Sequence, residues 1–283
     1  MTDPVRRILL VDCDMFFVQV ARLTDPEGAG RASLLMVGGS PEGRGVVTSA
    51  DYRVREYGVH SGMPMARARR LCPEATIAPV PRKACSHKSR EIREVLTSRA
   101  PVVEAASIDE FYLDLTGTER LYAGESLEAT ASRIRREVRE HTRISVSVGG
   151  GTVKLVAKLA VERAKPGGVH IVPAGDEAAF LRGIELARIP GVGPTFLTRL
   201  RDRGLHTVDD VLQVQQEWLR RWFGQARGRW LWERVRGIDP SPVSSDDARK
   251  SISSERTFPT DLNDDDELRR RTYELGERLK ERR

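Results

Sequence analysis

Three acidic residues stand at the ends of two apolar segments, where their carboxylates could bind metal ions. Asp12 ends the apolar run at residues 8–11, and Asp109 and Glu110 interrupt a second segment, residues 105–115, that is rich in strand formers. Acids buried in a sheet without partners are costly or become neutralised. Mg²⁺ removes that cost, because it is bound by one or two carboxylates together with water and substrate phosphates. If the two strands are neighbours, Asp12 and Asp109 can share metal ions.

The elements that must position these acids alternate between strands and helices. The apolar spacing predicts single strands at 8–12, 33–37, 45–50 and 144–148 and a pair of strands within 102–115. It predicts helices at 15–23, 64–71, 86–97, 127–143 and 152–163. Glycines 149–151 are expected to connect the last strand to the last helix. The order β…α-β-β-α-β is that of a split βαβ, ferredoxin-like fold.

The composition favours a polyanionic partner and is too polar for a membrane protein. The chain has 283 residues, 31% of them charged, and a formal net charge of +6 that comes mostly from arginine, so a polyanion suits it. Cys13, Cys72 and Cys85 show no CxxC spacing, and we expect them to be reduced in a cytoplasmic protein. The scattered histidines argue against a zinc site. The apolar run that begins at residue 8 stops at Asp12, so we expect no signal peptide.

The last hundred residues have a different character. Residues 189–193, Ile-Pro-Gly-Val-Gly, precede a helix predicted at 196–203 in a Trp-rich helical region that runs to about residue 239. A linker follows, and we then expect a strand at 250–258 and a helix at 267–283 with Leu268, Leu275 and Leu279 on one face.

The two segments that contain these acids resemble sequence motifs of a known protein family. Val11-Asp12-Cys13-Asp14-Met15-Phe16-Phe17 and Ser107-Ile108-Asp109-Glu110-Phe111-Tyr112-Leu113-Asp114 resemble the two palm motifs of Y-family DNA polymerases, closest to the DinB or polymerase IV branch. The resemblance runs from about residue 8 to the C-terminus. It implies an α+β fold: a ferredoxin-like palm (1–17 and 80–170), small α+β fingers (18–79), a helical thumb with a helix-hairpin-helix (171–240), a linker (241–249) and a partial little finger (250–283).

The resemblance also implies a reaction. Two Mg²⁺ ions would be bound by Asp12 and Asp109, with Glu110 as the third catalytic carboxylate and the Cys13 carbonyl as a further ligand. The chain would then add deoxynucleotides to a primer 3′-hydroxyl under template direction, with low fidelity, bypass of damaged bases and no proofreading. Asp14 belongs to the family pattern too, but a turn or capping acid at a helix start explains it as well as metal ligation does.

Further residues are implied to bind the nucleotide. Phe17 would lie against the sugar and exclude a 2′-hydroxyl, while Phe16 is assigned to the core. Ser49, Tyr52 and Arg55 fall in a motif that holds the triphosphate, although the motif alone would also suit a solvated basic loop. Lys165, in Ala164-Lys165-Pro166-Gly167-Gly168, would contact the β- and γ-phosphates, although a lysine at a helix end can simply complement the helix dipole.

The hairpin Gly191, Val192 and Gly193 resembles a helix-hairpin-helix that contacts a DNA phosphate through backbone N–H groups. The plain alternative is a glycine cap between two helices. The chain departs from the family at four other positions: Asp51 and Gly168 stand where Asn is usual, Ala21 where Glu is common, and Cys85 where Tyr is frequent. None of these changes removes a metal ligand; they bear on nucleotide affinity and primer positioning.

We expect a monomer whose partners are primer-template DNA, deoxynucleoside triphosphates and, as a candidate, the sliding clamp, with no membrane contact. A lone strand and helix bury little apolar surface. We therefore expect the leucine face of the last helix to be partly exposed or to dock on the palm or fingers, with weak, salt-sensitive DNA binding and short products. Two other classes stay open: a catalytically idle polymerase-like DNA-binding protein of the DNA damage response, which is expected to lack one of the acids, and a nucleotidyl cyclase, which needs neither the hairpin nor the steric gate.

Overall fold

The computed structural model of the chain describes residues 5–121, 124–245 and 251–280. The chain divides into two compact units, Met1–Asp14 with Ser86–Ser245 and Met15–Cys85 with Asp246–Arg283. The described residues form a five-stranded sheet in the first unit and a three-stranded sheet in the second. None of the described helices combines the length and the apolar composition that a membrane-spanning segment requires.

The five-stranded sheet is built around β1 (Ile8–Cys13), whose six residues are all buried. The strand order is β5 (Val102–Ala105), β6 (Glu110–Asp114), β1, β7 (Val146–Gly151), β8 (Val169–Ile171). Both neighbours of β1 run antiparallel to it. A run of apolar residues suits this central position, because a strand covered on both faces has no polar side to show.

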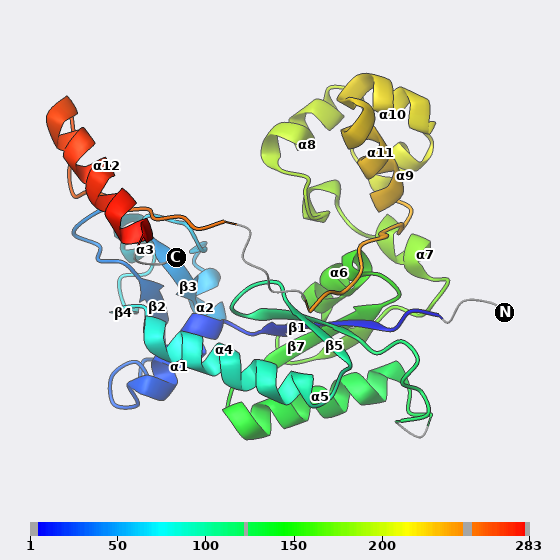
Figure 1. Ribbon diagram of the computed structural model, residues 1–283, viewed down its shortest axis with the longest axis horizontal. Coiled ribbons are helices and arrows are strands. Elements are labelled where there is room, and N and C mark those ends of the chain that lie inside the picture. The colour runs from blue at the N-terminus through cyan, green and yellow to red at the C-terminus, as the bar shows by residue number, and fades with distance from the viewer. Residues whose placement is uncertain (1–4, 122–123, 246–250, 281–283) are drawn as a thin grey trace. The chain divides into compact units, whose positions relative to one another are not determined.

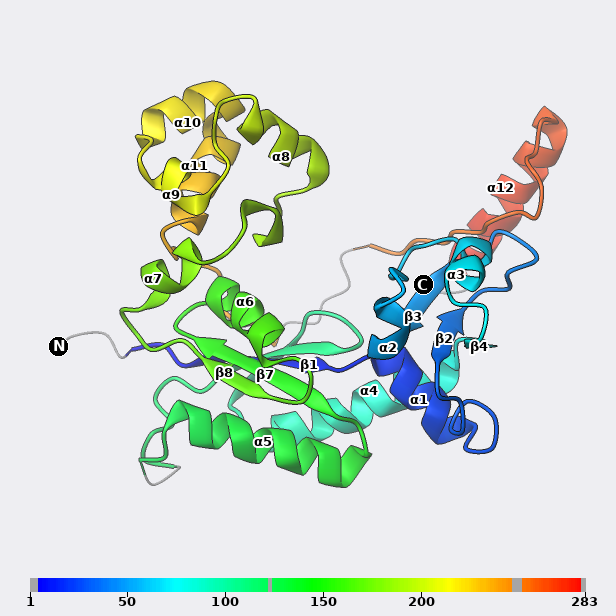
Figure 2. The same ribbon diagram turned by 180° about the vertical axis from the view of Figure 1, so that it is seen from behind.

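Helices cover both faces of this sheet (Figures 1 and 2). α5 (Leu127–Thr142) lies against β7 and β8, and α6 (Lys154–Ala164) lies on the opposite face. α4 (Arg82–Thr97) runs on the same side as α5. Ala131, Ile134 and Val138 form the buried face of α5, as their spacing predicts.

The glycines at 149–151 lie inside β7, not after it, so this part of the prediction was wrong. α6 packs directly on the strand at Gly149, where a Cβ atom would overlap the backbone of Ala157 and Val161. Glycine therefore serves close packing between a helix and a strand here, although glycine in a strand interior usually signals a break.

The helical region after β8 extends the first unit. It comprises α7 (Glu177–Arg182), a 3₁₀ turn η1 (Leu186–Arg188), α8 (Pro194–Arg201), α9 (Val208–Leu212), α10 (Gln216–Phe223) and α11 (Gln225–Arg234). Its buried residues, such as Leu200 and Leu231, form one core with Leu155 and Leu159 of α6. Past α11, the buried Asp239 accepts a hydrogen bond from the Leu155 backbone N–H (3.1 Å), at the start of α6.

The second unit contains a sheet of order β3 (Val47–Ala50), β2 (Leu35–Gly38), β4 (Thr76–Ala78). β2 and β3, which lie where two strands were predicted, pair antiparallel, whereas the parallel strand β4 was not foreseen. The unit also holds α1 (Phe16–Thr24), the short α2 (Tyr52–Arg55) and α3 (Met65–Leu71).

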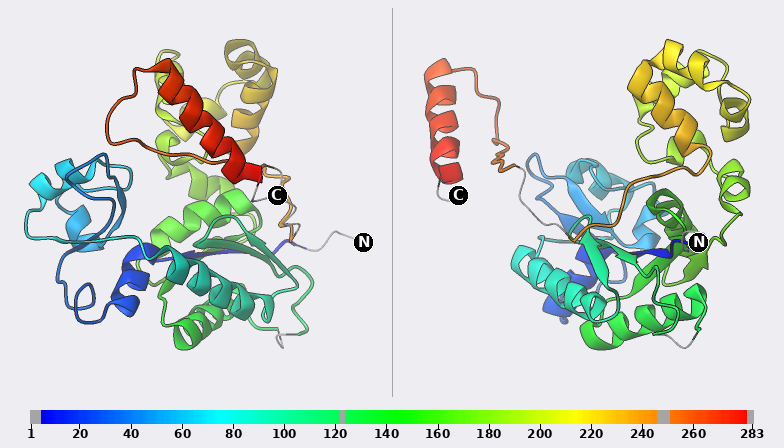
Figure 3. Two further views of the ribbon diagram at one scale, coloured as in Figure 1. Left: turned by 60° about the vertical axis from the view of Figure 1, so that its left-hand side comes forward. Right: turned by 45° about the vertical axis from the view of Figure 1, so that its right-hand side comes forward.

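The strand predicted at 250–258 is not found: residues 251–258 form no strand, and residue 250 lies outside the described residues. A single strand without a partner leaves its backbone N–H and C=O groups unpaired, so the strand-forming composition is not sufficient. α12 (Asp265–Lys280) follows this extended segment (Figure 3, red), and residues 281–283 of the predicted helix lie outside the described residues. Leu268 is 40% exposed and no residue of α12 is buried, so its leucine face is partly exposed, as predicted.

Candidate active site

The register of β1 and β6 brings the predicted acids together. Asp12 lies directly opposite Glu110, and the Cys13 backbone N–H donates a hydrogen bond to the Asp109 carbonyl (3.0 Å). The two strands are therefore neighbours, as shared metal binding requires. The Cys13 side chain is buried, and the role of its backbone carbonyl as a metal ligand stays a prediction.

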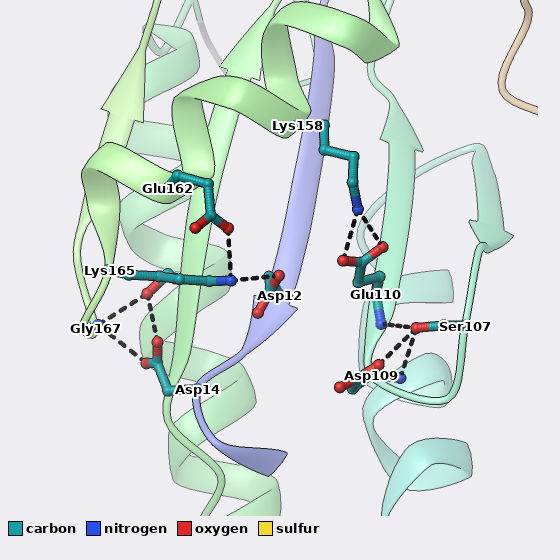
Figure 4. Close-up of polar contacts among 10 residues, drawn as sticks. Asp12, Asp14, Ser107, Asp109, Glu110, Lys158, Glu162, Lys165 and Gly167 are labelled. Atoms are coloured by element: carbon teal, nitrogen blue, oxygen red, sulfur yellow. Dashed lines mark hydrogen bonds and ion pairs between the residues drawn. The ribbon is translucent and has the colours of Figure 1, made fainter. Parts of the chain in front are cut away.

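Asp12 is a buried carboxylate that contacts a lysine. It is 7% exposed, and Lys165 Nζ lies 2.8 Å from its Oδ2 (Figure 4). Burial raises the pKa of Asp12 to about 6 against the attraction of Lys165, and the charges of Glu110 and Asp109 add to the rise. Burial alone would lower the pKa of Lys165, but Asp12 and Glu162 raise it, so the ammonium stays charged.

Glu110 and Asp109 are each held by a residue that the sequence analysis did not single out. Lys158 Nζ donates to both carboxylate oxygens of Glu110 at 2.7 Å. Ser107 Oγ donates to Asp109 Oδ1 at 2.6 Å and accepts from the backbone N–H groups of Asp109 (3.3 Å) and Glu110 (3.1 Å). The available signal for Lys158 was a charged stripe, Lys154, Lys158 and Glu162, at four-residue spacing on a helix whose other residues, apart from Arg163, are apolar.

The donor set suits a hard divalent cation. Its members are carboxylate and carbonyl oxygens, which Mg²⁺ prefers, and the clustered negative charge around Asp12 is unfavourable without positive charge nearby. In the part of the chain that the structure describes, no three His, Cys, Asp or Glu side chains are close enough together to hold a metal ion. Lys158 pairs with Glu110 and Lys165 pairs with Asp12, so a cation bound there has to compete with both ammonium groups.

Asp14 is directed away from this trio, toward β7 and the loop after α6 (Figure 4). It is 2% exposed and accepts hydrogen bonds from Ser147 Oγ (2.7 Å), Ser145 Oγ (3.0 Å) and the Gly167 N–H (3.0 Å). Its two oxygens are thus occupied by neutral donors of the first unit. This arrangement favours a structural role over metal ligation.

The nucleotide-binding residues predicted from the fingers motif lie in the second unit. The Arg55 guanidinium stacks over the Tyr52 ring at 4.9 Å and its Nε donates to the Ala50 carbonyl (2.9 Å). Ser49, on β3, is buried. Tyr52 and Arg55 are therefore brought together on one short helix.

Phe16 and Phe17 occupy different environments at the start of α1. Phe16 is buried, with 1% exposed, whereas Phe17 is half-buried and meets the Phe16 ring edge-on at 5.5 Å. The assignment of Phe16 to the core is confirmed by this burial. The role of Phe17 as a steric gate stays a prediction.

Asp51, one of the departures from the family pattern, has a structural role. Its carboxylate accepts from the backbone N–H groups of Val54 (3.0 Å), which caps α2, and of Leu35 (2.8 Å). Arg22 pairs with it at 3.1 Å. The charge that Asp51 introduces in place of Asn is therefore neutralised locally.

The predicted DNA-binding hairpin is braced from α11. Gly191 has a left-handed φ of +98°, and its carbonyl accepts a hydrogen bond from Arg227 Nη2 at 2.6 Å. A Cβ atom at Gly191 would lie 2.7 Å from the Trp230 ring, so glycine is required here. Val192 is buried, and Gly193 is the N-cap of α8 with Pro194 at the first helical position.

Comparison with known proteins places this chain in a family. Residues 11–162 match the model of the impB/mucB/samB family, residues 187–239 that of the DNA polymerase-iota thumb domain, and residues 249–283 that of the impB/mucB/samB C-terminal domain. The chain is 38% identical over 279 residues to the DNA polymerase IV of Staphylococcus saprophyticus, covering 98% of this chain and 76% of that protein. It is 39% identical over 270 residues to the DNA polymerase IV of Halorhodospira halophila, covering 95% of this chain and 74% of that one.

Solved structures support the same family assignment. DinB from Sulfolobus solfataricus superposes with a TM-score of 0.73 at 30% identity, and an insertion ternary complex of Dbh DNA polymerase with a TM-score of 0.74 at 29% identity. Each match covers 84% of this chain and 69% of the other. The chain therefore belongs to the Y-family of DNA-directed DNA polymerases, in the branch of DinB and DNA polymerase IV.

Proposed function

We propose that the chain is an error-prone translesion DNA polymerase that adds deoxynucleotides to a primer 3′-hydroxyl with two Mg²⁺ ions. The observation that carries this proposal is the register of β1 and β6, which sets Asp12 opposite Glu110 with Asp109 beside it. Three acids at one end of two neighbouring strands, within the family's matched region, supply the carboxylates that metal-assisted nucleotidyl transfer uses.

In this proposal Asp12, Asp109 and the Cys13 carbonyl hold the metal, with Glu110 as the third carboxylate. Mg²⁺ bound there supplies Lewis-acid activation of the primer 3′-hydroxyl and neutralises charge on the triphosphate. The hydroxyl loses its proton to water, its oxygen forms a bond to the α-phosphorus, and the bond between the α-phosphorus and the departing pyrophosphate oxygen breaks. Lys158 and Lys165 stabilise the acids before the substrate binds, since each donates to one of them.

The remaining site residues act on the nucleotide. Arg55 and Tyr52 offer a forked donor and a hydroxyl to phosphate oxygens, and their stacking orders both side chains before binding. Ser49 belongs to the same segment. Lys165 supplies a point charge for the β- and γ-phosphates, and Phe17 excludes the 2′-hydroxyl of a ribonucleotide.

DNA would be held by the thumb hairpin, Gly191 to Gly193, through its backbone N–H groups. The net charge of +6 supports binding to the phosphate backbone without sequence preference. We assign residues 1–17 and 80–170 to the palm, 18–79 to the fingers, 171–240 to the thumb and 250–283 to part of a little finger. The sliding clamp stays a candidate partner.

Primer extension tests the proposal. A labelled primer-template is incubated with each deoxynucleoside triphosphate singly, with and without Mg²⁺, and on templates with an undamaged or an abasic position. We expect metal-dependent extension, frequent mismatched insertion and some insertion opposite the abasic site. DNA binding without extension under any of these conditions would instead identify a catalytically idle relative.

A further inference from the structure

The loop that follows α6 has a conformation fixed by several separate contacts. Gly167 adopts a left-handed φ of +64°. The Gly168 N–H donates to the Ala164 carbonyl (2.9 Å), and the Gly168 carbonyl accepts from the Val148 N–H of β7 (3.0 Å). A Cβ atom at Gly168 would overlap the Ala164 carbonyl, so a residue with a side chain could not adopt this conformation unchanged.

This loop begins with Lys165, whose ammonium reaches Asp12, one of the proposed catalytic acids. Lys165 Nζ lies 2.8 Å from Asp12 Oδ2 and 2.8 Å from Glu162 Oε1. A lysine side chain is long and flexible, and it loses rotamer freedom when it is held in one place. A fixed backbone at the start of the side chain reduces the number of positions the ammonium can sample.

Asp14 is the group that ties this loop to the sheet. The Gly167 N–H donates to Asp14 Oδ2 (3.0 Å) and also to Ser147 Oγ (2.9 Å), and Ser147 Oγ in turn donates to Asp14 Oδ1 (2.7 Å). Hydrogen bonds to a buried carboxylate are stronger than those between neutral groups. On its other side, the Gly167 carbonyl accepts from Arg135 Nη1 of α5.

We infer that Asp14 is a positioning residue, which fixes the loop 165–168 through Gly167 and Ser147 and thereby holds the Lys165 ammonium at the Asp12 carboxylate. Asp14 does not touch the nucleotide or the metal in this scheme. The Asp14 carboxylate supplies hydrogen-bond acceptors on both of its oxygens, for the loop and for β7. The consequence for nucleotide binding rests on the proposed function of Lys165.

Kinetics with a double-mutant cycle test the inference. Asp14→Asn keeps the size of the side chain but replaces one acceptor oxygen by an NH₂ donor. We expect the KM for the incoming nucleotide to rise about tenfold, with kcat changing less and DNA affinity unchanged. Because Asp14 acts through Lys165, Asp14→Asn combined with Lys165→Ala should be no worse than Lys165→Ala alone. Additive effects of the two substitutions would overturn the inference.

A readout without catalysis separates this inference from the proposed function. Amide hydrogen exchange of peptides covering residues 165–170 should be faster in Asp14→Asn and in the milder Ser147→Ala than in the wild type. Unchanged exchange in both variants overturns the inference, whether or not the enzyme extends primers. If the wild type extends no primer while the exchange result holds, the proposed function fails and the positioning role stands.

The matched control is Asp239→Asn. Asp239 is also a buried acid of the first unit, with bonds to Arg234 (2.7 Å) and Ser241, but it contacts the start of α6 and not the loop. We expect it to lower thermal stability while leaving nucleotide KM and loop exchange as in the wild type. An equal rise in KM for Asp239→Asn would show that general destabilisation explains the Asp14 effect, and would overturn the inference.

Discussion

Lys158 Nζ lies 2.7 Å from both carboxylate oxygens of Glu110, so an ammonium group from the middle of α6 holds the acid at the start of β6 symmetrically. This contact orients Glu110 toward the surface of the sheet that α6 covers. It also supplies positive charge where Asp12, Asp109 and Glu110 would otherwise repel one another. The orientation of the acid is therefore a property of helix and sheet together.

The acids themselves should be indispensable for extension. Replacing Asp109 by Ala or Glu110 by Gln should reduce primer extension by roughly 10³-fold or more, because residues of one catalytic set act as a unit. DNA affinity should stay within the range of the wild type, since phosphate contacts lie elsewhere. Asp114→Asn, at the far end of β6, is the matched control and should keep its activity. Extension at the wild-type rate by either acid variant would disprove the assigned site.

Phe17 should control the choice of sugar. Replacing it by Ala or Val opens space beside the sugar, and we expect the ratio of ribonucleotide to deoxynucleotide incorporation to rise by roughly tenfold or more. Phe17→Tyr keeps the ring and should keep the selectivity. A ratio that does not change in the smaller variants would place the gate at another residue.

Asp239 should make stability depend on pH. Burial alone would raise its pKa, but hydrogen bonds from Ser241 and Arg234 and the charge of Arg234 outweigh burial and lower the pKa below its ordinary value of 3.8. Its contribution to stability is therefore present above pH 3.8 and is lost as the pH falls through the lower folded-state value. Urea unfolding near neutral pH should show Asp239→Asn less stable by about 1–3 kcal/mol. The difference in the free energy of unfolding between the wild type and Asp239→Asn should shrink below pH 3.8. A difference that grows there would contradict a lowered pKa of Asp239.

Arg227 should matter for DNA binding beyond its charge. Its guanidinium lies over the rings of Phe196 (4.4 Å) and Trp230 (4.5 Å) while it donates to the Gly191 carbonyl. Arg227→Ala should loosen the hairpin and weaken DNA affinity roughly tenfold, a loss of about 1.4 kcal/mol. Arg229→Ala removes the same charge from the same helix, where the side chain pairs with Glu233, and should have a smaller effect. Equal losses in fluorescence anisotropy titrations would mean that charge alone is responsible.

Gly149 should tolerate no side chain. Gly149→Ala places a methyl group against the backbone of Ala157 and Val161, which cannot move without shifting α6. We expect a loss of about 1–3 kcal/mol in the free energy of unfolding. Gly43→Ala is the control, because a Cβ atom there meets no atom within 4 Å. If thermal denaturation shows the two variants equally stable, α6 does not pack as closely on β7 as described.

The sequence by itself predicted most of the fold and located the acids that the proposed site uses. Apolar spacing located the amphipathic face of α5 at Ala131, Ile134 and Val138, and the apolar run before Asp12 identified the central strand. These signals are local, because each depends on which residues recur at the period of a helix or strand. The acidic trio was visible for the same reason: each charge interrupts an apolar segment.

Only the tertiary structure decided which groups meet across the chain. Lys158 reaches Glu110, and Gly167 reaches Asp14, across long sequence separations that no local period encodes. The glycines of β7 were misplaced because glycine weakens a strand considered alone, while here the backbone of α6 occupies the space of a Cβ atom at Gly149. The prediction of a strand at 250–258 was wrong for a different reason. Its residues favour an extended chain, but a strand forms only where a neighbouring strand pairs with its backbone N–H and C=O groups.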